Sequence, residues 1–154
     1  MYHSLKFLDM SHTHAWVLTH CIWATQGRLP LIPDVNEMCK YLTGIAHGKN
    51  VTLLAAGGTA NHIHVLIALP PTVPLSKVMQ DFKGNSSRWM NKRGTKFAWQ
   101  DGFGAFGASP SQKQTLCDYI ARQEEHHRKW TFEQEFVTLL RKSGAPIDWK
   151  RVFG

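Results

Sequence analysis

The hydrophobic residues of this chain change their spacing several times, and the order of these changes constrains its fold most strongly. Segments rich in β-branched and aromatic residues are typical of strands, and amphipathic segments with helical spacing lie between and after them. The predicted strands cover residues 14–25, 51–56, 61–69 and 97–107, and the predicted helices cover residues 34–48, 75–93, 109–129 and 131–144. This order predicts an α+β fold of the ferredoxin-like, split βαβ type. We expect an antiparallel sheet with helices on one face and two further helices appended at the C-terminal end.

Capping residues predict where three of these helices begin. A side-chain acceptor followed three residues later by Glu or Gln is typical of a capping box. Three pairs have this spacing: Asp34 with Glu37, Ser109 with Gln112, and Thr131 with Gln134. The helices that begin at Asp34 and Thr131 are expected to end near Gly48 and Gly144.

Three other glycines also predict local structure. Gly57 and Gly58 follow a predicted strand and are expected to begin a turn. Gly84 lies inside a predicted helix, where glycine costs up to about 1 kcal/mol relative to alanine. This cost indicates that another part of the chain packs closely against Gly84.

The chain is 154 residues long and 43% hydrophobic, with no repeat and no linker, so we expect a single domain over residues 1–154. No apolar run approaches the roughly 20 residues that span a membrane, and residues 1–10 lack the apolar stretch of a secretory signal. We therefore expect a cytoplasmic protein with no membrane partner. Cys21, Cys39 and Cys117 form no CxxC pair, so three reduced core thiols are expected.

The formal net charge of +7 favours a polyanionic partner, because each phosphate that a cation neutralises releases counterions. Charge alone does not decide this, since many basic proteins bind no specific polyanion. Six Trp and eight Phe add aromatic rings that could stack on unpaired bases.

His62 and His64 lie two residues apart in a predicted strand. Residues i and i+2 of a strand point to the same face, so both imidazoles project together while Ile63 points into the core. Neutral imidazole is a common ligand of divalent metals. A metal site and a pair of histidines without a metal, on a solvated or hydrogen-bonded face of the sheet, fit this pattern equally well.

The predicted helix after residue 109 carries a second group of polar residues. Tyr119, Gln123 and His127 follow each other at intervals of four, so they share one face of the helix. A tyrosine can act as a covalent nucleophile, and a glutamine amide oxygen can bind a hard cation. From the helix alone, however, a tyrosine at such a position is usually half-buried and only packs against the core.

The predicted helix over residues 75–93 has a basic polar face that could contact phosphates, or that could be an ordinary solvated surface. The candidate DNA-binding residues on it are Lys77, Lys83, Ser86, Ser87, Arg88, Lys92 and Arg93.

In combination, these features resemble the single-tyrosine HUH transposases, a family that includes insertion-sequence transposases and REP-associated tyrosine transposases. HUH denotes His–hydrophobe–His, here His62–Ile63–His64 within NHIHVLI. The resemblance continues through FKGNSSRWMNK, WQDGFGAFGASPS and YIARQEEHHRKWTFEQEF, and it covers about residues 14–140.

The resemblance implies a role for each residue. His62, His64 and Gln123 would hold a Mg²⁺ or Mn²⁺ ion. Tyr119 would attack a DNA phosphate, leaving a 5′-phosphotyrosine and a free 3′-OH, and the reverse reaction would rejoin strands. The expected activity is that of a metal-dependent single-strand DNA transposase or nuclease acting on hairpin-bearing DNA.

The sequence leaves several points open. Asn61 stands where many members of the family carry Asp, which could change the orientation of His62. The base that accepts the Tyr119 proton could be Glu124, His126 or His127. The resemblance allows a homodimer, which we favour, in which Tyr119 reaches the partner's metal site, and it also allows a monomer.

Three alternative functions fit parts of the pattern. A histidine-triad hydrolase requires a third alternating histidine, and Leu66 occupies that position. A catalytically inactive or domesticated protein that binds DNA hairpins is the main alternative, although Tyr119, His62, His64 and Gln123 are all retained. A purely structural ferredoxin-like protein is disfavoured by the basic charge and the clustered histidines.

Overall fold

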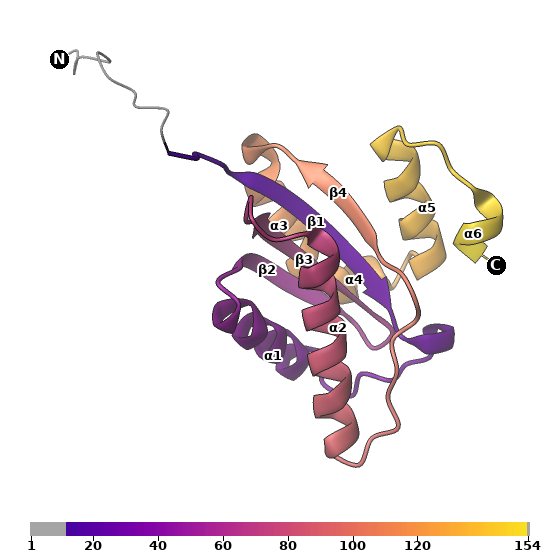
Figure 1. The fold of residues 1–154 in the computed structure, drawn as a ribbon. Helices are drawn as coiled ribbons and strands as arrows, with labels where there is room; N and C mark the ends of the chain where they lie inside the picture. The colour runs from indigo at the N-terminus through magenta and orange to yellow at the C-terminus, as the bar shows by residue number, and fades with distance from the viewer. Residues whose placement is uncertain (1–11, 154) are drawn as a thin grey trace, which may run out of the picture.

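The computed structural model describes residues 12–153, so the expectation for the N-terminal segment lies outside the described residues. The strands are β1 (Val17–Ala24), β2 (Thr52–Thr59), β3 (His62–Leu69) and β4 (Gly104–Ala108). They form one antiparallel sheet in the order β2-β3-β1-β4, with β3 and β1 at its centre (Figure 1). The sheet order and the position of the first two helices confirm the ferredoxin-like α+β fold.

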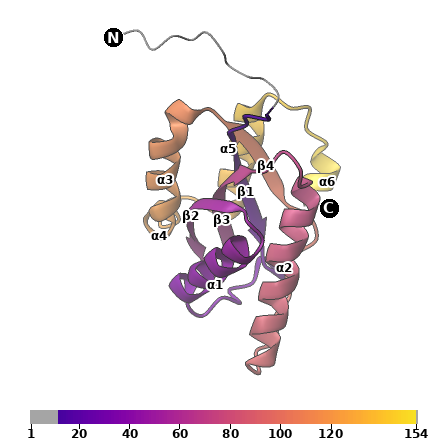
Figure 2. The same ribbon diagram turned by 60° about the vertical axis from the view of Figure 1, so that its left-hand side comes forward.

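Helices cover both faces of this sheet. The helices α1 (Val35–Gly48) and α2 (Leu75–Lys92) lie on one face, and the opposite side carries α3 (Lys113–Ala121) and α4 (Gln123–His126) (Figures 1 and 2). The helices α5 (Phe132–Ser143) and α6 (Trp149–Phe153) follow beside the β4 edge. No helix in the described part of the chain is both long and apolar enough to cross a membrane.

Side chains along β3 point alternately to the two faces of the sheet, and the two faces have different surroundings. Ile63, Val65 and Ile67 are buried in the main core beneath α1 and α2. Leu66 lies in a smaller apolar cluster with Ile120 of α3, and His64 precedes it on the same face. The large core therefore packs against one face of the sheet, and the histidines of β3 project from the opposite face.

The helices α3 and α4, expected only as additions at the C-terminal end, cover the second face of the sheet, which the expectation had left open. The C-terminal half differs from the expectation in two ways. The single helix expected over residues 109–129 is broken at Arg122, whose φ of −104° and ψ of 25° are not helical. The strand expected from residue 97 begins only at Gly104, after a loop in which Gly102 has a φ of +85°.

The capping predictions agree better with the structure. The Asp34 carboxylate accepts a hydrogen bond from the Glu37 amide at 3.0 Å, and α1 ends at Gly48 as expected. A complete capping box forms at Thr131, and at Ser109 the Gln112 side chain accepts a hydrogen bond from the Ser109 amide at 3.0 Å. Gly144 ends α5 with a φ of +70°. All three cysteines are free thiols.

The predictions for Gly57, Gly58 and Gly84 were all wrong, for two different reasons. Gly57 and Gly58 lie inside β2 rather than in a turn. A Cβ atom on Gly57 would lie 2.1 Å from the carbonyl oxygen of Ile120, so glycine at this position lets α3 pack directly on the sheet. By contrast, a Cβ atom on Gly84 would meet no heavy atom of the described residues within 4 Å outside its own helix backbone, so the expected close packing is absent.

We therefore expect Gly84→Ala to stabilise the protein by about 0.5–1 kcal/mol, because alanine has the higher helix propensity and meets open space here. The free energy of unfolding in urea measures this change. Gly57→Ala is the matched control and should destabilise the protein, since its methyl group collides with the backbone of α3. Equal effects of the two substitutions would contradict this account.

Candidate active site

His62 and His64 project from the same face of β3, as the strand alternation predicts. Their ring centroids lie 5.1 Å apart, and both side chains are fully buried. Burial excludes the alternative in which the two rings simply lie on a solvated sheet surface.

The orientation of the His62 ring is set by residues in the turn before it. Its Nδ1–H donates to Asn61 Oδ1 at 2.8 Å and also lies 2.9 Å from Thr59 Oγ1. The Asn61 amide in turn donates from Nδ2 to the Arg28 carbonyl at 3.3 Å, which orients Oδ1 toward His62. Asn61 accepts this hydrogen bond and thereby orients the His62 ring. Nε2 of His62 then faces the interior of the site.

His64 and His127 are oriented in the same way. His64 Nδ1 shares a hydrogen bond of 2.8 Å with His20 Nε2 on the neighbouring strand β1. His127 follows α4, and its Nδ1–H donates to the Trp130 carbonyl at 2.8 Å. In both rings Nε2 points toward the interior of the site, as it does in His62.

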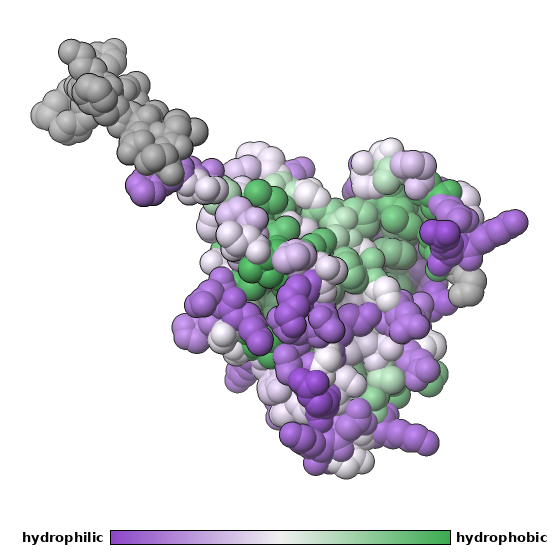
Figure 3. Space-filling view, viewed as in Figure 1, coloured by the Kyte–Doolittle hydropathy of each residue, from purple (hydrophilic) through white to green (hydrophobic). Residues whose placement is uncertain are grey.

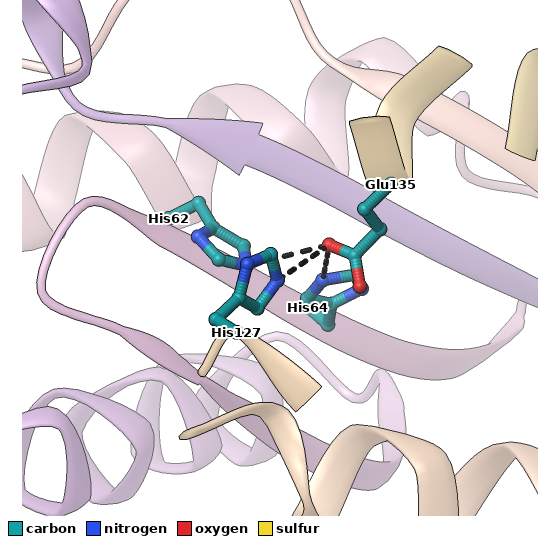
Figure 4. A group of neighbouring side chains, drawn as sticks. All are labelled: His62, His64, His127 and Glu135. Carbon is teal, nitrogen blue, oxygen red and sulfur yellow. Dashed lines mark hydrogen bonds and ion pairs between the residues drawn. The ribbon is translucent and has the colours of Figure 1, made fainter. Parts of the chain in front are cut away.

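A buried carboxylate completes the group. Glu135 on α5 is only 2% exposed. Its Oε1 atom lies 2.9 Å from His64 Nε2, 3.0 Å from His127 Nε2 and 3.5 Å from His62 Nε2. Figure 4 shows the three imidazoles, from β3 and from the end of α4, converging on this oxygen.

This group has the composition and spacing of a site for a divalent cation. The four donor atoms of His62, His64, His127 and Glu135 all lie within 4.8 Å of one another. Donors held tetrahedrally at about 2.1 Å from one ion are about 3.4 Å apart. The distances from Glu135 Oε1 to the three nitrogen atoms, 2.9–3.5 Å, are close to that spacing.

The hydrogen bonds outside the group strengthen this interpretation. A neutral imidazole that donates from Nδ1 carries a lone pair at Nε2. His62 and His127 therefore present lone pairs to a carboxylate oxygen, an arrangement that requires a second proton on each ring or a cation between them. Burial lowers the pKa of His64 to about 3, partly opposed by Glu135, and this disfavours the protonated ring. A metal cation would bind the same Nε2 lone pairs and the carboxylate oxygen without a second proton on the rings.

Tyr119 reaches the group from α3 of the same chain. Its ring packs edge-on against the His64 ring with centroids 5.7 Å apart, and its hydroxyl donates a short hydrogen bond to Glu135 Oε2. Burial first, and then the Glu135 carboxylate, raise the pKa of Tyr119 well above its ordinary value. Burial raises the pKa of Glu135, but hydrogen bonds that His127, His62 and His64 donate when they carry a proton on Nε2 outweigh burial, so in that state the Glu135 pKa lies well below its usual range.

Gln123 also lies where the helical spacing predicts. It is buried, and its Oε1 atom is 3.3 Å from His62 Nε2 and 3.0 Å from His127 Nε2. Its amide nitrogen lies 3.3 Å from the Tyr119 carbonyl. The structure thus brings together the four residues that the resemblance implies, although α3 and α4 are separate helices.

The position of α5 explains how Glu135 enters the site. The ring of Phe132 packs against His62 at 5.0 Å, and Phe136 stacks on Phe132 at 5.7 Å. Phe136 also lies so close to Gly104 that a Cβ there would be 2.7 Å from its ring. Figure 3 shows apolar surface between β4 and α5, where a hollow of about 230 Å³ includes Phe132 and Phe136.

Sequence reasoning missed Glu135 and His20. One signal for Glu135 was available, because Phe132, Glu135, Phe136 and Leu139 have the spacing of a single helix face. A carboxylate within such an apolar stripe indicates a buried partner. His20 carried no comparable signal, because its partner His64 is 44 residues away in the chain. His126, left open as a base, lies 3.3 Å from Glu135 Oε2.

The basic residues of α2 lie on the opposite face of the sheet from Tyr119. Lys83 is held by the carbonyl groups of Gln100 and Gly102, each at 2.8 Å. The expected phosphate contact of Ser86 is contradicted by its burial, since its hydroxyl donates to the Phe82 carbonyl and accepts from the Trp99 indole. Lys77 and Arg93 form ion pairs with Asp81 and Glu37, respectively.

A larger hollow lies directly beside Tyr119. It has a volume of about 510 Å³ and combines cationic, acidic and aromatic side chains. Its lining residues include Tyr119, Arg122, Glu125, His126, Lys129 and Trp130. Trp130 is 48% exposed, and its ring is parallel to that of His126, with centroids 6.2 Å apart.

Much of this chain is similar to known proteins. A profile of the family described as "Transposase IS200 like" matches residues 14–123. The transposases for insertion sequence element IS200 of Salmonella typhimurium and of Salmonella typhi are each 30% identical to the chain over 80 residues. These alignments cover 46% of this chain and 53% of each relative, so the chain spans about half the length of the curated relatives it matches.

Two solved structures share the fold. A crystal structure of a protein of Deinococcus radiodurans R1, assigned as a transposase, superposes with a TM-score of 0.58 and 19% identity, over 73% of this chain and 95% of the other. The structure of a REP-associated tyrosine transposase bound to a REP hairpin superposes with a TM-score of 0.57 and 16% identity, over 90% of this chain and 89% of the other.

Proposed function

The chain belongs to the family of IS200-like transposases, and on that premise we propose that it cleaves and rejoins single-stranded, hairpin-bearing DNA through a covalent bond to Tyr119. One observation carries the proposal. Within one chain, the hydroxyl of Tyr119 meets a buried group of imidazoles and a carboxylate that has the spacing of a metal site.

The proposed reaction exchanges one phosphodiester for another. Tyr119 Oη attacks the phosphorus, the Oη–P bond forms and the P–O3′ bond breaks, leaving a 5′-phosphotyrosine and a 3′-OH. The net reaction transfers the phenolic proton to the released 3′ oxygen. Attack by another 3′-OH reverses the step and rejoins strands. Glu135 remains ionised because of its low pKa, so it can orient the hydroxyl as an acceptor but is a weak base.

A divalent cation is part of the proposal. His62 and His64 would hold it with Gln123, the ligand set that the resemblance implies, and Mg²⁺ or Mn²⁺ is the expected ion. When bound, the cation would polarise the scissile phosphate and offset its negative charge. The chain's own contribution is to keep the nitrogen atoms aimed inward, through Asn61 on His62 and His20 on His64.

The hollow beside Tyr119 is the proposed path of the strand. The positively charged side chains of Arg122 and Lys129 can contact the phosphates, and the ring of Trp130 can stack on an unpaired base. The solved protein with 16% identity was bound to a REP hairpin, so hairpin-bearing strands are the substrates to test first. Five basic residues on or directly after α2, together with the Ser87 hydroxyl, would hold DNA away from the cleavage site: Lys77, Lys83, Arg88, Lys92 and Arg93.

We expect Trp130→Ala to weaken the binding of single-stranded DNA by about 5- to 150-fold, because one base–aromatic stack contributes about 1–3 kcal/mol. Fluorescence anisotropy with a labelled strand measures this change. Trp149→Ala is the matched control, since Trp149 on α6 is 42% exposed but does not line the hollow. Equal losses in both variants would show that Trp130 has no particular role.

The direct test of the proposed function is trapping of the covalent intermediate. Protein, Mn²⁺ and a labelled hairpin-bearing strand from the DNA that flanks its gene should yield a protein–DNA adduct on a denaturing gel. Omission of the cation should remove the adduct. Tight binding without any adduct would instead favour the inactive hairpin-binding protein.

Assembly is a separate proposal. Tyr119 reaches the histidine group of its own chain, so one chain can supply the nucleophile and the metal ligands. The homodimer that the resemblance allows and the single domain expected over residues 1–154 remain predictions from the sequence.

A further inference from the structure

We propose that His127 and Glu135 are metal ligands in addition to His62 and His64, so that three imidazoles and one carboxylate face the cation that the proposed function also assigns to Gln123. This inference rests on the proposed function only in taking that cation as given. The two added residues follow residue 123, where the match to the family profile ends. They are also absent from the ligand set that the resemblance implies.

His127 is prepared to bind a cation by its surroundings. Its Nδ1–H is used by the Trp130 carbonyl, so Nε2 faces the site with a lone pair in the neutral ring. Its ring lies edge-on to His62 with centroids 4.4 Å apart. A backbone carbonyl that accepts from the outer nitrogen is a common way for proteins to orient a metal-binding histidine.

Glu135 lacks the partner that usually neutralises a buried carboxylate. Among the described residues no lysine or arginine forms an ion pair with it, and its ion-pair partners are His62, His64, His126 and His127. An uncompensated charge in the interior is costly. A divalent cation among the nitrogen atoms would neutralise it.

The two oxygen atoms of Glu135 then have different tasks. Oε1 faces the three Nε2 atoms and would bind the cation, while Oε2 accepts the hydroxyl hydrogen of Tyr119. A single rigid carboxylate group would thereby fix the distance between the nucleophile and the cation. Glu135 is a positioning residue for Tyr119 as well as a ligand.

The donor set also predicts which cations bind. Three imidazoles and one carboxylate suit Zn²⁺ and Mn²⁺ better than Mg²⁺, which prefers oxygen ligands and retains its water. We therefore expect the metal-free full-length chain to bind Mn²⁺ and Zn²⁺ more tightly than Mg²⁺ in the absence of DNA. Isothermal titration calorimetry measures the three affinities without any reliance on catalysis.

The decisive comparison is between two neighbouring glutamates. Glu135→Gln should weaken Mn²⁺ binding at least 10-fold, a loss of about the size that follows removal of groups supporting a metal site. Glu133→Gln is the matched control on the same helix and should bind like the wild-type chain, because Glu133 pairs with Arg28 on the surface. His127→Gln should weaken binding as Glu135→Gln does, which provides a second test if Glu135→Gln does not fold by circular dichroism.

Two results would overturn the inference. One is wild-type Mn²⁺ affinity in both Glu135→Gln and His127→Gln. The other is a loss of affinity in Gln123→Ala but not in Glu135→Gln, which would make Gln123 the oxygen ligand. Either result, together with a normal Tyr119 adduct, would leave the proposed function standing. Absence of the adduct despite the expected affinities would instead reject the transposase activity and leave the four-ligand site intact.

Discussion

Replacing Tyr119 with phenylalanine is expected to abolish the covalent protein–DNA adduct while leaving DNA binding nearly unchanged. The phenol oxygen is the atom that forms the bond to phosphorus, and phenylalanine preserves the ring that packs against His64 and His20. We expect adduct formation to fall at least about 10³-fold, the scale seen when a covalent nucleophile is removed. Denaturing gels measure the adduct, and fluorescence anisotropy measures binding.

Tyr41→Phe is the control for this substitution. Tyr41 stacks on Trp89 of α2, on the other face of the sheet, and its hydroxyl makes only a long contact of 3.5 Å with the Asn85 carbonyl. This variant should form the adduct at the wild-type rate. An adduct that persists in Tyr119→Phe would assign the nucleophile to another residue, and a joint loss of binding and adduct would indicate disrupted folding.

Replacing His64 with alanine should have the second largest effect. It removes a donor at the centre of the group, where Nε2 lies 2.9 Å from Glu135 Oε1 and Nδ1 lies 2.8 Å from His20. We expect cleavage to fall at least about 100-fold, since loss of a metal ligand should exceed the 10- to 100-fold cost of losing an outer-shell partner. Cleavage of a labelled hairpin strand across a range of Mn²⁺ concentrations measures the effect.

The same substitution should also change stability. His20 loses its hydrogen-bonding partner inside the protein, which costs about 1–3 kcal/mol for the unsatisfied group, whereas Glu135 keeps His127 and Tyr119. His47→Ala on the exposed surface of α1 is the control and should alter neither cleavage nor stability. Undiminished cleavage in His64→Ala would remove the histidine pair from the proposed mechanism.

Much of the site follows from local geometry. A strand repeats its side-chain direction every two residues, and this repeat by itself predicts that His62 and His64 share one face. A helix repeats approximately every four residues, and this repeat predicts that Gln123 lies near Tyr119, a relation that survives the break at Arg122. In both cases the two residues are near neighbours in the sequence, so backbone geometry alone relates their positions.

The errors concern the way in which elements pack. Ser86 was predicted on a DNA-binding surface because its hydroxyl is polar, yet the indole of Trp99 and the Phe82 carbonyl bury it. Gly57 was predicted in a turn because glycine is common there, yet it lies in a strand where α3 approaches too closely for a side chain. Propensity describes a residue alone, whereas both outcomes depend on a partner distant in the chain.

The sequence by itself therefore determined the strand and helix order, the histidine pair on β3 and the tyrosine and glutamine on one helical side. Only the tertiary structure decided that α5 folds back so that Glu135, 71 residues from His64 in the chain, joins the two groups. The physical reason is range. Backbone geometry relates near neighbours in the chain, whereas the contact between α5 and β3 arises from burial of Phe132 and Phe136 against the sheet.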